Sequence, residues 1–523
     1  MKSMSVSRRT LLTGTVALGT VGLLAACGGS KEKVGGSAAN NAEDILKNLQ
    51  INKQDRSSLK KGGTLTLAAT ALGPNFNLLT QSGYTSSNLD ALAPCNIAAV
   101  MGFYTMSPDG ESTLNPEFCT EHKTETVNGV QTATFKINPK AAFNDGTPID
   151  IDALKATWQI QRDPEGAYKI AAAGIYEFIE SVEAIDGDRY HARVVFKTAH
   201  NPVKGLLFGG ILHPAMLDVN LFNEGFVDNP HPELGCGPFT LAPNGWNSSE
   251  KTLTLTRNDK WWGEKPVLER IVFRQMDAAA ERAAFKNDEI DAAPATAAAS
   301  YKELKEIANT EMRRGVRLFS GGMVMNPARM QDVALRRAVV AGMNREAIAK
   351  VRFQGLDYEE KQPGSMIHMP FSEYYQDVYP TPNNDAAAAA KILEEAGYTK
   401  NGEFYEKDGK QAAFKYSVFG EDPTSKAVGQ TLVQQLKSAG INAELDSRAV
   451  SEFNKTMASK DYDATSSGFA PSSPDATEAT EQFYMRRKPE EAGSDEINEM
   501  IAKMKLIADN KERNLACNEI EKK

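Results

Sequence analysis

Alternating apolar and polar residues, the pattern of a β-strand with one buried face, recur along the chain from residue 62 onward. The alternation starts at Gly62–Leu67 (GGTLTL) and returns at Tyr190–Lys197 (YHARVVFK) and at Leu253–Arg257. A further short strand is predicted at Ile441–Leu445, directly after Gly440. Strands are therefore expected in widely separated parts of the chain.

Helical periodicity, with apolar residues three and four apart, marks other stretches. It predicts helices at Ala153–Arg162, Ala334–Val351, Ala386–Ala396 and Lys426–Ser438. Gly397 directly follows the third of these helices and is expected to cap its C-terminus. Because strands and helices alternate through the second half of the chain, the pattern predicts an α/β fold with mixed sheets.

The first 26 residues have the three parts of an export signal: a basic start with Arg8 and Arg9, an apolar run, and small residues before Cys27. The apolar run covers about 15 residues, whereas a membrane-spanning helix needs about 20. Residues 1–26 are therefore predicted to be a removable signal. Leu24–Gly28 (LAACG) resembles the bacterial lipoprotein signal, in which Cys27 would be lipidated and become the first mature residue.

The compartment follows from this signal. We expect a protein on the extracytoplasmic face of the cell membrane, anchored by a lipid on Cys27. The paired arginines resemble a twin-arginine export signal, but such pairs also open ordinary signals, so both routes stay open. Residues 27–61 are rich in Gly, Ser, Asn and Lys and cannot bury enough apolar surface to offset their ordering entropy. They are predicted to form a flexible stalk.

Charge and reactive residues narrow the class of function. The chain carries 59 Lys and Arg against 68 Asp and Glu, a net charge of -9, which argues against a nucleic-acid partner. Its six histidines lie in no metal-binding spacing, and there is no nucleophile elbow or phosphate-binding loop. We therefore expect a binding protein without cofactor or metal. A hydrolase assembled from distant residues is the alternative from another class.

Four cysteines remain after the signal: Cys95, Cys119, Cys236 and Cys517. None lies in a Cys-x-x-Cys spacing, so zinc binding has little support. In an exported protein a Cys95–Cys119 disulfide is compatible with the sequence. Cys236 and Cys517 are equally compatible with free thiols.

Several motifs, in the same order along the chain, resemble the family 5 solute-binding proteins, the oligopeptide- and dipeptide-binding components of ABC importers. They are Phe143–Pro148 (FNDGTP), Gly235–Phe239 (GCGPF), Arg257–Pro266 (RNDKWWGEKP), Asn287–Asp291 (NDEID), Asp332–Arg345, Lys391–Tyr398 (KILEEAGY) and Lys460–Asp463 (KDYD). The third is the most specific, because it resembles the family's Asn-x-x-Tyr/Trp-Trp-Gly-x-x-Pro signature. The resemblance extends from about Gly62 to Lys523.

The resemblance implies an α/β, two-lobe fold of the periplasmic-binding-protein type II class. Lobe I would span 62–295, with an extra subdomain inserted at about 85–190, and lobe II would span 296–523. A solute would be enclosed between the lobes, and closure would present a surface to the permease subunits of an ABC importer. The expected solute is a peptide and the expected protein a monomer. An oligosaccharide or a metal chelate is the alternative, since relatives of this family also take such ligands.

The resemblance also suggests ligand contacts. They are Ser82, Gly83 and Tyr84 in a loop of the first lobe, Trp246 in a polar loop, Asn326 before the helix at Asp332, and Gly468, Phe469, Ser472 and Asp475 in the second lobe. The loop and the Gly468–Phe469 strand would pair with the backbone of an extended peptide. Phe319 and Met323 could line the cleft floor, but core packing is expected for both. Trp261 and Trp262 are assigned to structure.

The sequence departs from the family in two places. Oligopeptide binders carry an aspartate that pairs with the peptide's amine, and here that position falls on Ser472, with Asp475 displaced by three residues. Loss of that charge-assisted hydrogen bond removes about 1.5–3 kcal/mol. Either the ligand lacks a free amine or Asp475 substitutes. In addition, family members continue past the helix at Glu519–Lys523 and return to the first lobe, whereas this sequence stops before that return; a fragment and a frameshifted gene are both compatible with this.

Overall fold

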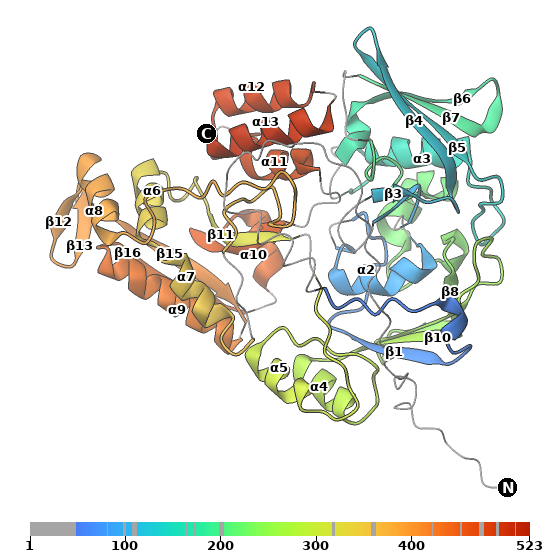
Figure 1. Ribbon diagram of the computed structural model, residues 1–523, viewed down its shortest axis with the longest axis horizontal. Coiled ribbons are helices and arrows are strands. Elements are labelled where there is room, and N and C mark those ends of the chain that lie inside the picture. Colours follow the sequence, from blue (N-terminus) through green and yellow to red (C-terminus); the bar gives the residue numbers. More distant parts are fainter. Residues whose placement is uncertain are drawn as a thin grey trace, which may run out of the picture. The chain divides into compact units, whose positions relative to one another are not determined.

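The computed structural model describes residues 49–80, 82–97, 101–106, 112–163, 166–170, 174–197, 203–315, 319–356, 362–420, 422–449, 452–469, 475–487, 491–507 and 509–523. The chain divides into two compact units, one with Leu49–Ala295 and Glu303–Gly315, the other with Thr296–Lys302 and Val316–Lys523 (Figure 1). The predicted signal, Cys27 and the stalk up to residue 48 lie outside the described residues. None of the helices within the described ranges is long and apolar enough to cross a membrane.

One four-stranded mixed sheet of the first unit has the order β1-β10-β9-β8. Its strands are β1 (Thr64–Ala69), β8 (Phe239–Asn247), β9 (Thr252–Arg257) and β10 (Arg270–Gln275). β1 runs parallel to β10, and the other pairs are antiparallel. The alternation in β9 and β10 places Leu253, Leu255, Ile271 and Phe273 in one buried cluster. The strands predicted from this alternation near residues 62 and 253 are confirmed.

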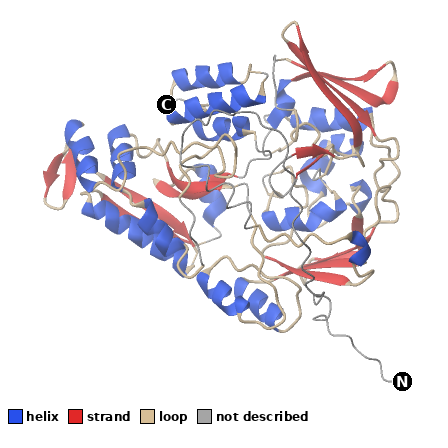
Figure 2. Ribbon diagram, in the orientation of Figure 1, coloured by secondary structure: helices blue, strands red, loops and turns tan. Residues whose placement is uncertain are grey.

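A second sheet of the same unit consists of two antiparallel hairpins in the order β4-β5-β7-β6, which Figure 2 shows as long red ribbons. Its strands are β4 (Cys119–Val127), β5 (Val130–Ile137), β6 (Ile179–Ile185) and β7 (Asp188–Phe196). Helix α3 (Ile151–Gln161) packs on β6 and β7. Asp150 caps this helix, because its carboxylate accepts a hydrogen bond from the Asp152 amide at 2.9 Å. Both α3 and β7 confirm the elements predicted from periodicity.

The first unit is completed by shorter elements. These are α2 (Ser86–Leu92), α4 (Ala278–Lys286), the strand pair β2 (Tyr104–Met106) and β3 (Ser112–Leu114), and helical turns at Arg56–Ser58, Ala93–Cys95, Gly174–Phe178, Pro214–Leu217, Leu221–Gly225 and Pro232–Leu234. Helix α5 (Ala298–Lys305) carries residues of both units.

Three of the sequence motifs of the first unit meet at the side chain of Asn258. Asn258 is only 3% exposed, and its Nδ2 donates to Asn144 Oδ1 at 2.7 Å and to the Gly237 carbonyl at 2.8 Å. Asn144 in turn donates to the Pro232 carbonyl at 2.8 Å. Satisfied buried amides of this kind fix the relative position of three loops. The motifs therefore hold the first unit together.

The tryptophans of the signature Arg257–Pro266 also have structural roles. Trp261 lies in the larger buried cluster of the first unit, and Trp262 packs against Phe118 with ring centroids 5.1 Å apart. The Trp262 indole nitrogen donates to the Glu117 carbonyl at 2.7 Å. These contacts agree with the assignment of both residues to structure.

The second unit contains a four-stranded sheet with the order β11-β17-β15-β16. Its strands are β11 (Ser320–Met325), β15 (Ala413–Phe419), β16 (Asn442–Arg448) and β17 (Ala464–Phe469). β15 runs parallel to both β16 and β17, whereas β11 is antiparallel to β17. Helix α9 (Pro423–Ser438) packs along β15 and β16, and α7 (Arg345–Arg352) packs along α9 (Figure 1). Together with the first unit, this sheet confirms the predicted α/β fold with mixed sheets.

The remaining elements of the second unit are α6 (Val333–Gly342), α8 (Ala386–Glu395), α10 (Phe453–Ser459), and a small sheet of β12 (Thr399–Asn401), β13 (Phe404–Lys407) and β14 (Lys410–Gln411). Three C-terminal helices, α11 (Ala476–Tyr484), α12 (Asp495–Met504) and α13 (Asn510–Lys522), pack around a separate apolar cluster. Gly397 follows α8 with φ of +87°, which confirms the predicted cap.

The single helix predicted at Ala334–Val351 is wrong, because the structure has two helices there, α6 and α7. The break falls at Asn344, whose side-chain oxygen accepts a hydrogen bond from the Ala347 amide at 2.9 Å and so caps α7. Gln435 of α9 holds the Asn344 backbone, with its side chain accepting from the amide at 3.0 Å and donating to the carbonyl at 3.3 Å. A contact from a distant helix thus overrides the local periodicity.

The possible Cys95–Cys119 disulfide is absent. Cys95, Cys119, Cys236 and Cys517 are all free and buried. Cys95 and Cys119 belong to two different buried clusters of the first unit, so their side chains pack into separate apolar surroundings. Cys236 accepts a hydrogen bond from Asn96 Nδ2 at 3.1 Å. These thiols act as small buried apolar groups.

Candidate ligand-binding site

The loop predicted to contact ligand in the first unit presents Ser82 and Tyr84 to solvent. Tyr84 is 63% exposed, whereas Gly83 is buried and its amide donates to the Thr80 carbonyl at 3.2 Å. A Cβ added at Gly83 would overlap the Asn77 carbonyl oxygen. Glycine is therefore required at this position by close packing within the unit.

Ser82 and Thr85 fix the two ends of this loop. The Ser82 hydroxyl accepts a hydrogen bond from Asn75 Nδ2 at 2.9 Å. The Thr85 hydroxyl accepts from the Asn88 amide at 3.2 Å and caps helix α2. The loop is thus held at both ends while the Tyr84 ring and hydroxyl project outward.

Trp246 lies in strand β8 rather than in an open loop. Its ring meets Phe76 edge-on at a centroid distance of 4.9 Å, and Lys251 Nζ lies 5.4 Å from the ring centroid. The indole nitrogen is buried and has no hydrogen-bond partner among the described residues. The structure places Trp246 against the apolar cluster of the first unit.

Gly468 and Phe469 form the end of β17, next to the start of β11. Gly468 pairs with Gly321, and Phe469 pairs with Ser320. A Cβ at Gly468 would lie 2.5 Å from the Ser320 carbonyl oxygen, so close packing of the two strands excludes a side chain there. Gly468 is nevertheless exposed to solvent.

The other edge of β17 is only partly paired. β15 pairs with β17 at Tyr416↔Ala464 and Ser417↔Thr465, and then continues beside β16 up to Phe419. Over the described residues, the stretch from Ser466 to Phe469 therefore has β11 on one side and no strand on the other. Half-paired strand edges of this kind are where an extended chain can add through main-chain hydrogen bonds.

Asn326, also predicted to contact ligand, is buried and used internally. Its Nδ2 donates to the carbonyls of Lys460 at 2.8 Å and Tyr462 at 3.1 Å, and its Oδ1 accepts from the Ala328 amide at 3.1 Å. Arg329 nearby forms ion pairs with Asp463 at 2.7 Å and Asp461 at 3.0 Å. These bonds explain the Lys460–Asp463 motif as a structural link between β11 and β17.

Asp475 is likewise used within the second unit. Its carboxylate caps α11 through the Thr477 amide at 2.9 Å and forms an ion pair with Arg513 of α13 at 2.5 Å. Burial would raise the pKa of Asp475, but the Arg513 charge and the Thr477 hydrogen bonds outweigh it and the pKa is lowered. Ser472, the position that matches the family aspartate, lies outside the described residues.

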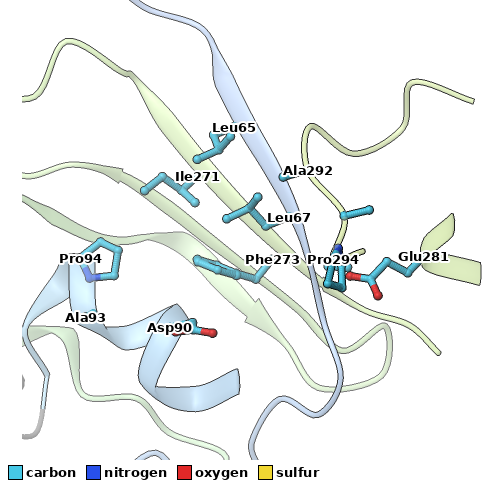
Figure 3. Close-up of a pocket in the computed structure, with 12 residues that line it drawn as sticks. Leu65, Leu67, Asp90, Ala93, Pro94, Ile271, Phe273, Glu281, Ala292 and Pro294 are labelled. Carbon is cyan, nitrogen blue, oxygen red and sulfur yellow. The ribbon is translucent and has the colours of Figure 1, made fainter. Parts of the chain in front are cut away.

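The first unit also contains an open groove of about 490 Å³. Figure 3 shows the residues that line it as sticks. Leu65, Leu67, Ile271 and Phe273 of β1 and β10 form its apolar floor, with the Ala93–Pro94 turn beside them. Two carboxyl groups, Asp90 and Glu281, lie at its border, and burial raises the pKa of Glu281. The twelve lining residues include none of the contacts predicted from sequence.

Sequence reasoning was wrong about Phe319, which was expected to pack in the core. Phe319 is 44% exposed, immediately before β11. Met323, four residues further along the chain and on the same face of the sheet, does pack against the buried cluster of the second unit. The signal that could have distinguished them is the glycine pattern: Gly321 and Gly468 leave the sheet face beside Phe319 without side chains.

Comparison with known proteins identifies the family. The sequence profile of the bacterial extracellular solute-binding proteins, family 5 (middle region), matches residues 113–489. The chain belongs to the family 5 solute-binding proteins. As a family 5 member, it is a solute-binding protein of the ABC transporter type and not an enzyme.

One sequence relative and two solved structures illustrate what the chain is similar to. The oligopeptide-binding protein OppA of Mycobacterium tuberculosis is 29% identical over 412 residues, which cover 77% of this chain and 67% of the relative. Among solved structures, the periplasmic EDTA-binding protein EppA is similar with a TM-score of 0.77 at 21% identity, covering 88% of each chain. Lactococcal OppA, in complex with an endogenous peptide, gives 0.72 at 18% identity, covering 88% of this chain and 92% of that one. These structures show the type II periplasmic-binding-protein fold.

Proposed function

We propose that this family 5 protein captures peptides outside the cytoplasm and delivers them to the permease of an ABC importer. The observation that carries the proposal is the half-paired strand β17, whose end carries small residues from Ser466 to Gly468, with Ser466 and Gly468 exposed. An extended peptide can add to such an edge through main-chain hydrogen bonds. Each bond of this kind contributes about 0.5–1.5 kcal/mol net.

The residues at this edge favour recognition of a peptide's backbone over recognition of its side chains. Ser466, Ser467 and Gly468 carry little bulk, so a peptide main chain can approach the strand closely. The Tyr416 hydroxyl is hydrogen-bonded to the Ser466 side chain, which orients this hydroxyl pair. Main-chain recognition tolerates different peptide sequences, as a nutrient importer requires. The relative named as oligopeptide-binding and the peptide complex of the lactococcal protein support the same ligand class.

We also infer that a lipid on Cys27 anchors the protein at the extracytoplasmic face of the membrane. The LAACG motif at Leu24–Gly28 supports cleavage before Cys27 and lipidation of that cysteine. Residues 27–48 would then act as the tether; the predicted stalk 27–61 is shortened because Leu49 onward belongs to the first compact unit, where Arg56 pairs with Glu264. Export through the twin-arginine route, supported by Arg8 and Arg9, and a monomeric state belong to the same proposal.

A second ligand class is favoured by the position of Asp475. Because its carboxylate is neutralised by Arg513 and caps α11, it is not arranged to receive a ligand ammonium group. Solutes without a free amine, such as blocked peptides or metal chelates, fit this arrangement. The EDTA-binding protein with the same fold supports chelates as the runner-up.

Calorimetric titration with matched peptides tests the proposal. The ligands are a free pentapeptide, its N-acetylated form and an analogue methylated at alternate backbone nitrogens. We expect the first two to bind with similar affinity, and the methylated analogue to bind at least tenfold more weakly because it lacks main-chain donors. Lys410→Ala changes an exposed residue of strand β14, away from β17. This variant is the control for the protein and should bind each peptide as the wild-type protein does.

Two results would decide against this proposal. Equal binding of the methylated analogue would exclude recognition of the backbone. Binding of a nickel or iron chelate, without binding of any peptide, would select the second ligand class.

A further inference from the structure

The aromatic ring of Phe319 rests on a pair of glycines that face each other across two strands. Gly321 of β11 and Gly468 of β17 are cross-strand partners. A Cβ added at Gly321 would lie 2.6 Å from Phe319 Cε1, and one added at Gly468 would come closer still to Phe319 Cζ. The ring can approach the backbone this closely only because both positions lack a side chain.

The position of this ring on the sheet follows from the register. Side chains alternate between the two faces of a strand, so Phe319, Gly321 and Met323 point to the same face. Met323 packs against the buried cluster, whereas Phe319 is 44% exposed. The apolar face of the sheet therefore ends at Phe319, at the same end of β17 as its half-paired edge.

We propose that Phe319 is a specificity-determining residue, whose ring stacks on an aromatic side chain of a peptide bound along β17. The proposal rests on the peptide-binding function proposed above and adds a preference to it. A peptide strand added beside β17 directs every second side chain to the face on which the Phe319 ring lies. Aromatic pairs are favoured beyond the effect of their apolar area, because their quadrupoles attract in offset or edge-on arrangements.

A purely structural role is the competing explanation. An aromatic ring that covers glycines shields their backbone from water and stabilises the sheet edge. Leucine at position 319 would also cover apolar surface there, but it has no ring to pair with an aromatic ligand. Phe319→Leu therefore separates the two roles, and Phe319→Tyr keeps the ring.

The experiment compares two series of N-acetylated alanine pentapeptides, titrated into the full-length protein. One series places phenylalanine at each position in turn, and the other places cyclohexylalanine, which has similar bulk without π electrons. In the wild-type protein we expect the best phenylalanine peptide to bind about fivefold more tightly than its cyclohexyl partner. This ratio should fall to about one in Phe319→Leu and persist in Phe319→Tyr.

The outcomes separate the two proposals. If the wild-type protein binds no peptide of either series, the peptide-binding function itself fails. If peptides bind and the wild-type protein shows no aromatic preference, or Phe319→Leu keeps the preference, the stacking role is overturned and the backbone-reading function stands. Thermal unfolding midpoints of both variants confirm that the fold is intact, so a lost preference is not a lost fold.

Discussion

The Asp475 carboxylate and the Arg513 guanidinium form a largely buried ion pair that joins the start of α11 to the first turn of α13. The two side chains are 14% and 5% exposed, and the Oδ2···Nη2 distance is 2.5 Å. The pair lies beside the apolar cluster of the three C-terminal helices. Its position indicates that the last described helix is held by charge as well as by packing.

Replacing Asp475 by asparagine should destabilise the second unit. The change leaves Arg513 as a buried charge without its anionic partner, which typically costs about 3–5 kcal/mol. Urea unfolding measures the effect. Glu519→Gln removes an exposed pair with Lys522 and should change the free energy of unfolding by less than about 1 kcal/mol. Unchanged stability of Asp475→Asn, with loss of ligand binding, would show instead that Asp475 serves the ligand.

Acid should weaken the same group of helices through His368. This residue is 1% exposed, and burial lowers its pKa from 6.5 to about 4. Nε2 donates to the Asn514 carbonyl at 3.5 Å, and Nδ1 has no partner among the described residues. Between pH 6.5 and about 4 the unfolded chain binds a proton that the folded protein excludes.

This difference in proton binding sets the direction in which pH changes the free energy of unfolding. Stability is fully present above pH 6.5 and is lost as the pH falls toward 4, by about 3 kcal/mol in total. Urea unfolding of the wild-type protein and of His368→Gln, at pH 7.5 and at pH 4.5, tests the claim. The variant should lack this pH-dependent loss. Parallel pH profiles for the two proteins would contradict it.

The thiols should be unreactive in the folded protein and fully titratable after unfolding. Burial raises the pKa of Cys119, Cys236 and Cys517 to about 12 and that of Cys95 as well. In a Cys27→Ser protein at pH 8, a thiol-specific disulfide reagent should therefore modify none of the four. In guanidinium chloride without reductant it should modify all four. A count of two after unfolding would reveal a disulfide.

The link between Asn144 and Asn258 should appear as an energetic coupling. The two amides are joined at 2.7 Å and are 7% and 3% exposed. Either alanine variant should lower the free energy of unfolding by about 1–3 kcal/mol, because a buried polar partner loses its hydrogen bond. The double variant should cost less than the sum of the two single changes. Strict additivity would mean that the three motifs are not connected through this bond.

The sequence predicted those elements whose pattern is local. Alternation located β1, β7 and β9, and periodicity located α3, α8 and α9, because a buried face leaves its mark on every second or every third and fourth residue. The motifs around Asn144 and Asn258 identified the family. The helix break at Asn344 could not be read locally, since it depends on Gln435 of a distant helix.

The candidate site was less predictable for a related reason. Asn326 and Asp475 carry groups that could serve a ligand, but partners far away in the sequence use them within the fold. Phe319 was expected to pack in the core because it is large and apolar. Its actual environment could not be predicted locally, because it depends on Gly468, about 150 residues away. Polar and aromatic residues near the proposed binding strand are therefore assigned from their tertiary contacts, not from their spacing.

Amide hydrogen exchange, with and without a bound N-acetylated peptide, tests the central claim most directly. We expect the peptide to increase protection at Ser466–Phe469 of β17, with little change in β16, because new main-chain hydrogen bonds form only at the half-paired edge. A peptide that binds and leaves the exchange of these four amides unchanged would contradict recognition at β17.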